Sequence, residues 1–181
     1  MLKSQEKKKT ILKLVIASFL SLNISLSAKS TNSNLEIEYK NLSNNQKATL
    51  IRTFYNGKSF DYGYTMAAIA WQESYFGKYL INLNDPSCGV FHVMPKYVGN
   101  KRNSKWAQSR ICERLIADYN FSFSSALERL KYFENYWKSK GVKKVWSHTV
   151  SSYNQGFNYR KNSEYLNAIK EKIRFLKKKI K

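Results

Sequence analysis

Glu73 is the acidic residue whose surroundings best suit catalysis. It stands in the stretch "WQESYFG" (71–77), directly after an apolar run rich in strong helix formers, Met66–Ala70. Gly77 indicates the end of that helix, so Glu73 is expected in the last turn, where the helix dipole disfavours a negative charge. The flanking aromatic side chains also disfavour a charged carboxyl group, because they remove water from it. A carboxyl group that keeps its proton is what a glycosidase-type general acid requires.

An ion pair with one of the many lysines would explain Glu73 equally well from its position alone. The other acidic residues lack an apolar setting, and Asp61 is predicted to cap or turn the chain before the Glu73 helix. Asp85, in "NLNDPSCG", is the only further acid near the site, and its Asp-Pro context is typical of a turn. A second catalytic carboxylate, where the reaction needs one, is expected to be Asp85.

Metal and thiol chemistry are not predicted. The two histidines, His92 and His148, are too few for a metal site, and neither cysteine has a recognisable nucleophile motif. Cys88 and Cys112 could form a disulfide in an oxidising compartment, although the sequence does not fix their geometry. No metal and no cofactor are expected.

The N-terminal residues predict export. A cationic start, "MLKSQEKKKT", precedes an apolar stretch that ends in small residues, which is typical of a secretory signal peptide over residues 1–28. An uncleaved anchor is the alternative, and the lack of a cysteine near the end of the stretch argues against a lipoprotein. The formal net charge of +20 favours attraction to a polyanion. Export makes nucleic acid a poor candidate, which leaves an anionic membrane or a carboxylate-bearing wall, in the periplasm or cell wall.

The rest of the chain is predicted to be mainly helical. A polar lead-in (residues 29–45, with a short ordered piece around 35–39) precedes one compact domain, residues 46–181. A long loop, Ile81–Asn103, follows Glu73, and long loops in compact domains tend to be functional. The expected helices are Gln46–Tyr55, Tyr64–Tyr75, a segment after Ser125, Val142–Tyr153 and a C-terminal helix capped by Ser163.

Three short motifs occur in a fixed order: "ESYFG" (73–77), "SCGVFHVMP" (87–95) and "SSYNQGF" (151–157). Together they resemble the motif series of lysozyme-like lytic transglycosylases (SLT-type domains). That family has a Glu-Ser pair, then a Gly-Leu-Met-Gln-like segment leading to a proline, then Ala-Tyr-Asn-x-Gly. The resemblance covers residues 64–166. It implies a mainly α, lysozyme-like domain with a long active-site loop and room for a small β element.

The resemblance also implies roles for individual residues. Glu73 would protonate the glycosidic oxygen between N-acetylmuramic acid and N-acetylglucosamine, then take the proton of the muramic 6-hydroxyl as a 1,6-anhydro ring closes. Ser74 would contact substrate or steady the site, and Tyr153 would hydrogen-bond the catalytic carboxyl group. The remaining implied residues are Asn154, which would support the cleft wall, and a substrate-facing loop of Gly89, Val90 and Phe91. His92 departs from the family pattern, which usually has glutamine there.

One acid suffices for this reaction, because a hydroxyl of the substrate replaces the attacking water. The sequence therefore predicts an exported peptidoglycan lytic transglycosylase that acts on glycan strands and, in some settings, works with a secretion or conjugation assembly. The alternatives are a lysozyme-type hydrolase that uses Asp85, and a non-catalytic wall-binding module of a secretion apparatus. A basic membrane-disrupting protein is a more remote third.

The last helix is basic and amphipathic, "EYLNAIKEKIRFLKKKIK". Its apolar stripe is expected to dock on the core and leave the lysines in solvent. The alternative is contact with an anionic membrane surface or with a partner helix.

Overall fold

The computed structural model describes residues 33–100, 102–161 and 163–180. The predicted signal peptide, residues 1–28, lies outside these ranges. The chain divides into a unit that ends at Leu42 and a compact unit from Ser43 to Lys181. In the first unit, residues 33–40 form a helix, where the sequence predicted a short ordered piece within the lead-in.

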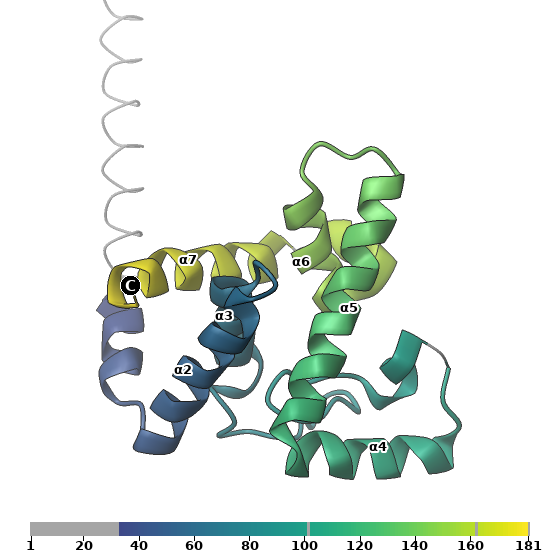
Figure 1. Ribbon diagram of the computed structural model, residues 1–181, viewed down its shortest axis with the longest axis horizontal. Helices are drawn as coiled ribbons and strands as arrows, with labels where there is room; N and C mark the ends of the chain where they lie inside the picture. Colours follow the sequence, from purple (N-terminus) through teal and green to yellow (C-terminus); the bar gives the residue numbers. More distant parts are fainter. Residues whose placement is uncertain (1–32, 101, 162, 181) are drawn as a thin grey trace, which may run out of the picture. The chain divides into compact units, whose positions relative to one another are not determined.

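The second unit is built from helices, which confirms the prediction of a mainly α fold. None of the described helices is both long and apolar enough to cross a membrane. The described residues contain two isolated antiparallel bridges, Ile81 with Cys88 and Cys88 with Val93, in place of a strand. In chain order the elements are α2 (Asn44–Lys58), α3 (Gly63–Ser74), η1 (Pro95–Asn100), α4 (Lys105–Ala117), α5 (Tyr119–Ser139), α6 (Val145–Gln155), η2 (Gly156–Lys161) and α7 (Ser163–Lys179), as Figure 1 shows.

α3, the helix that carries Glu73, is the buried centre of this unit. Its residues from Met66 to Ala70 are all fully buried, because the run of small and apolar side chains lets neighbouring helices approach on every side. The predicted cap, Asp61, is a turn residue with a φ of 63°, and the N-cap of α3 is Tyr62, which makes no side-chain capping bond. The helix is therefore held by burial more than by capping.

α7 lies against α3 (Figure 1). The ring of Phe175 packs edge-on against Trp71 with centroids 5.6 Å apart, and the Tyr64 hydroxyl donates to the Ile180 carbonyl at 2.8 Å. Ile169 and Leu176 are fully buried, while the lysines of the last turn are exposed. The apolar stripe of the basic helix is thus used inside the domain, as expected.

α4 was not predicted from the sequence, and α5 begins earlier than the sequence indicated. α4 buries only Leu115, so it has no apolar stripe from which a helical period could be recognised. Capping marks both helices: Ser104 accepts from the Ala107 amide, and Asp118 accepts from the Phe121 amide at 3.1 Å. α4 and α5 follow, in chain order, the loop that approaches Glu73.

Candidate active site

Glu73 is the penultimate residue of α3, in the last turn as predicted. The helix stops because Tyr75, Phe76 and Gly77 adopt positive φ angles of 51°, 57° and 87° in succession. Gln46 of α2 donates to the Tyr75 carbonyl at 2.8 Å and so satisfies one of the carbonyls left open at the helix end. This turn sends the chain away from the helix and leaves the Glu73 side chain at the edge of the core.

The Glu73 carboxyl group is largely shielded, with 13% of its side chain exposed. One oxygen, Oε1, accepts a hydrogen bond of 2.6 Å from the Tyr165 hydroxyl. The other oxygen, Oε2, lies 3.6 Å from Nδ1 of His92. Within the described residues this histidine, and not a lysine, is the ionisable cation beside Glu73. The lysine pair that position alone allowed is therefore not observed there.

Tyr165 is the site residue that the sequence analysis missed. It belongs to α7 and is separated from Glu73 by 92 positions, outside all three motifs. Burial first, and then the negative charge of Glu73, raise the pKa of the Tyr165 phenol well above its ordinary value. The hydroxyl therefore keeps its proton and acts as a hydrogen-bond donor to Glu73. In the sequence, the only indication that Tyr165 is buried is its position one helical turn before Ile169, on the apolar face of the C-terminal helix.

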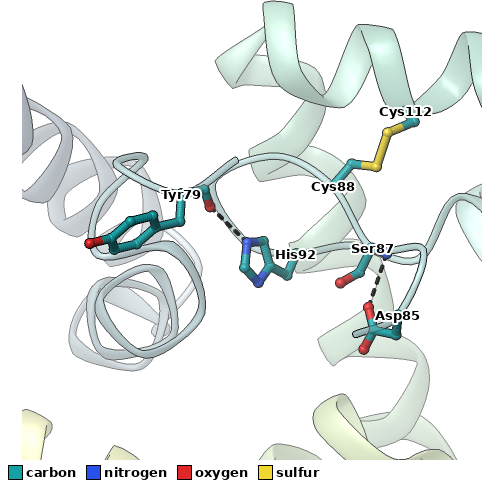
Figure 2. Close-up of a disulfide and its surroundings, with 6 residues drawn as sticks. All are labelled: Tyr79, Asp85, Ser87, Cys88, His92 and Cys112. Atoms are coloured by element: carbon teal, nitrogen blue, oxygen red, sulfur yellow. Dashed lines mark hydrogen bonds between the residues drawn. A yellow bond between two sulfur atoms is a disulfide. The ribbon is translucent and has the colours of Figure 1, made fainter. Parts of the chain in front are cut away.

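His92 reaches Glu73 from a tight turn whose conformation gives the histidine a φ of 43°. Its Nε2 lies 2.8 Å from the backbone carbonyl of Tyr79, as Figure 2 shows. Because a carbonyl can only accept, Nε2 carries a hydrogen, and Nδ1 is left to face the Glu73 carboxyl group. The backbone thus fixes which ring nitrogen meets the acid.

The surroundings of His92 act on its pKa in opposite directions. Burial lowers its pKa, but the bonds to Glu73 and to the Tyr79 carbonyl, with the charges of Glu73 and Asp85, outweigh burial and raise the pKa above 6.5. Nδ1 of His92 and Oε2 of Glu73, 3.6 Å apart, are therefore placed to interact as an ionisable pair.

The turn that carries His92 is closed by two backbone hydrogen bonds and one disulfide. Cys88 and Val93 exchange bonds of 3.0 and 2.9 Å, and Cys88 is joined to Cys112 of α4 with a Cα–Cα distance of 5.4 Å (Figure 2). Gly89 has a φ of 81°, and a Cβ there would lie 2.4 Å from the Leu115 carbonyl oxygen. The turn is therefore pinned to α4 both covalently and by close packing.

The three residues that the resemblance placed in a substrate-facing loop are packed inside the protein. Gly89, Val90 and Phe91 are buried, and the Phe91 ring packs edge-on against Phe123 of α5 with centroids 5.9 Å apart. They face inward because the turn packs against α4 and α5, where burial of its apolar surface lowers the free energy of the fold. Only His92 of this segment turns toward Glu73.

Ser74 and Tyr153 both hold this turn in place. The buried Ser74 hydroxyl donates to the Val90 carbonyl at 2.6 Å and accepts from the Gly77 amide at 2.8 Å. The Tyr153 hydroxyl donates to the Phe91 carbonyl at 2.8 Å, whereas the implied bond to Glu73 is made by Tyr165. Tyr153 is still close enough for the charge of Glu73 to raise its pKa, after burial as the larger cause. Ser74 thus has a steadying role.

The other two candidates are at the surface. Asn154 is exposed at the end of α6 and lines a groove with Met94 and Arg129. Asp85 is exposed, and its Oδ1 accepts from the Ser87 amide at 3.0 Å (Figure 2). That bond closes a local turn, in keeping with the expected structural role of an Asp-Pro pair.

The described residues contain no group of three or more histidine, cysteine or acidic side chains that could hold a metal ion. No protein-family model, curated protein or solved structure matches this chain. The arrangement of Glu73, His92 and Tyr165 must therefore be interpreted by its own chemistry.

Proposed function

We propose that this protein is an exported peptidoglycan lytic transglycosylase with a lysozyme-like fold, in which Glu73 serves as both acid and base. The observation that carries the proposal is the setting of the Glu73 carboxyl group. It is shielded from water, fixed through Oε1 by the Tyr165 hydroxyl, and faced at Oε2 by Nδ1 of His92 at 3.6 Å. A single well-oriented carboxyl group that can give up a proton and take one back suits this reaction.

In the proposed reaction, Glu73 gives its proton to the glycosidic oxygen that links muramic C1 to the next sugar. The C1–O bond breaks, and the leaving sugar departs as an alcohol. The Glu73 carboxylate then removes the proton of the muramic 6-hydroxyl as O6 bonds to C1. The ring closes as 1,6-anhydro-muramic acid, water is not consumed, and Glu73 is protonated again.

Tyr165 and His92 support the two halves of this cycle differently. The Tyr165 hydroxyl stabilises the carboxylate that forms when the proton leaves, because a bond to a charged acceptor is stronger than one to a neutral acceptor. His92 faces the other carboxyl oxygen through Nδ1, and its Nε2 bond to the Tyr79 carbonyl keeps the ring in position. The glutamine usual in the family would place no ionisable group beside the carboxyl group.

Asp85 is the residue on which the rival hydrolase reading depends. Its charge is felt at His92, where it helps to raise the pKa, so it lies within electrostatic reach of the pair. Its side chain is engaged by the Ser87 amide in an exposed turn, however, rather than directed by a buried partner. We therefore favour the transglycosylase and treat hydrolysis as an outcome of the test.

The test is mass spectrometry of the fragments that the purified protein releases from isolated sacculi. The wild type, Glu73→Gln and Glu113→Gln are compared; Glu113 is an exposed acid on α4 and serves as the control. We expect anhydro-muramic ends from the wild type and Glu113→Gln, and none from Glu73→Gln. Reducing ends would show a hydrolase, with Asp85→Asn as the next variant. Binding to sacculi without release of fragments would favour a non-catalytic wall-binding module.

A further inference from the structure

A groove of about 500 Å³ is lined in part by residues that follow His92 and Tyr153 closely in the sequence. Its walls come from the segment after His92, from α5, and from the end of α6 with η2. The lining combines one guanidinium, aromatic rings and side-chain amides, among them Tyr97, Arg129, Tyr132, Phe133, Asn154 and Gln155. Glu73 itself is not part of the lining.

Arg129 is a half-buried cation with unused hydrogen-bonding capacity. Its Nε donates to the Tyr153 carbonyl at 3.2 Å, which satisfies one of the carbonyls left open in the last turn of α6. Its guanidinium carbon lies 5.2 Å from the ring centroid of Phe133 and 5.9 Å from that of Tyr97. Within the described residues Arg129 makes no other hydrogen bond and has no carboxylate partner. The two terminal nitrogens of the fork are thus available.

A cation in this position has a cost that an anionic ligand would offset. Burial lowers the pKa of Arg129, which shows that its charged form is partly deprived of water, yet a guanidinium remains charged at neutral pH. Charges withdrawn from water are ordinarily paired. By contrast, Arg114 is exposed on α4 and has Asp118 as its partner at 3.9 Å.

The groove is electrostatically connected to the candidate active site. The charge of Arg129 lowers the pKa of Tyr165, against the larger effects of burial and Glu73, and Tyr165 is the residue that donates to Glu73. The carbonyl that Arg129 binds belongs to Tyr153, next to Asn154 of the groove. We therefore expect a polymer bound across Glu73 to extend toward Arg129.

The geometry points to a carboxylate-binding subsite: we propose that Arg129 recognises a carboxylate carried by a muramic acid residue of the bound glycan strand. A planar fork matches the two oxygens of a carboxylate. The amides of Asn154 and Gln155 can bond to amide groups of the ligand, and the exposed ring of Tyr132 offers apolar surface to a sugar. The carboxylate has two sources, the free lactyl group of naked strands and the stem peptide of substituted strands. This inference rests on the proposed function.

The experiment measures binding without turnover, with the full chain carrying Glu73→Gln. Three ligands are titrated: a neutral N-acetylglucosamine tetramer, naked glycan fragments with free lactyl carboxylates, and fragments that carry stem peptides. Adding Arg129→Gln is expected to weaken binding of a carboxylate-bearing ligand about 10-fold or more and to leave the neutral tetramer unchanged. Arg114→Gln, the matched control, should change none of the three. Whichever charged ligand loses affinity identifies the source of the carboxylate.

Equal weakening of neutral and charged ligands, or no weakening, would overturn the subsite. Arg129 also supports α6, so a second measurement uses the unmutated groove. The guanidinium resonances of Arg129 in an NMR spectrum should shift with N-acetylmuramic acid and not with N-acetylglucosamine; identical responses to the two sugars would refute the proposal as well. Failure of the proposed function appears separately, as absence of anhydro ends from sacculi.

Discussion

Replacement of Tyr165 by phenylalanine tests the arrangement around Glu73 most directly. The change removes one hydroxyl, whose 2.6 Å bond to Oε1 is the shortest contact that holds the acid. A hydrogen bond to a charged group contributes about 1.5–3 kcal/mol. If that bond is strongest when Glu73 is ionised, the same energy is lost from the transition state. At about 1.4 kcal/mol per tenfold, kcat/KM should fall roughly 10- to 150-fold.

Tyr153→Phe is the matched control, because it removes a hydroxyl from an equally buried tyrosine nearby. Its lost partner is the Phe91 carbonyl, an acceptor that would be left buried and unsatisfied. The expected cost is about 1–3 kcal/mol of folding stability. For a domain of this size that corresponds to roughly 3–10 °C in Tm. Tyr165→Phe should change Tm far less, because Glu73 retains some exposure and its histidine partner.

The assay pairs initial rates of anhydro-muropeptide release with thermal melting followed by circular dichroism. Rates are measured well below the melting temperature of both variants, so that unfolding does not lower the activity. The reasoning predicts that Tyr165→Phe loses activity at nearly unchanged Tm, and that Tyr153→Phe shows the opposite pattern. If Tyr153→Phe were the variant that lost activity while remaining stable, Tyr153 would be the residue that orients Glu73 and our assignment would be wrong.

Three further predictions concern the turn that carries His92. Replacing Cys88 and Cys112 by serine removes a cross-link between residues 24 positions apart, which should lower the free energy of unfolding by about 3.5 kcal/mol through chain entropy. The loss is measured as a lower urea midpoint, and an unchanged midpoint would contradict a structural role for the disulfide. Gly89→Ala places a Cβ against the Leu115 carbonyl at a φ of 81°, so we expect the free energy of unfolding to fall by roughly 2–4 kcal/mol in the same assay. A fall smaller than the error of the measurement would show that the turn is free to shift. Because the pKa of His92 is raised in the folded protein, its stabilisation is fully present below its unfolded value of about 6.5 and is lost as pH rises through the raised pKa. His92→Gln should therefore flatten the decline of unfolding free energy on the alkaline side and remove the histidine-dependent alkaline limb of kcat/KM. A variant with both profiles unchanged would refute the interaction of His92 with Glu73.

The position of Glu73 in the last turn of a helix could be predicted from the sequence because all its signals are local. The apolar run before Glu73 and the glycine after it predict the last turn of a helix. The predicted helix ends at Tyr75, and α3 ends at Ser74. The general helical character follows from the same periodicities. Local pattern was enough wherever the determinant lay within one helix.

The partners of the acid could not be predicted in the same way. Tyr165 comes to Glu73 only because the stripe of α7 docks along α3, and that docking depends on packing between distant segments. Gly89 is inward-facing because of a backbone carbonyl on α4, a helix that the sequence pattern did not reveal. Motif order indicated that these regions meet, but it could not tell a residue that touches substrate from one that holds the turn.

Most of the motif residues share one mechanical task, which is to place His92. Ser74 fixes the turn from the end of α3, Tyr153 fixes it from α6, and the disulfide fixes it from α4. Three separate helices thus converge on this turn. Their support holds Nδ1 of His92 3.6 Å from Oε2 of Glu73, so a displacement of the turn would weaken the interaction between the two residues. If the proposed function is right, rigidity of this turn is a requirement of catalysis, and variants that loosen it should lose the alkaline limb of activity before they lose the fold.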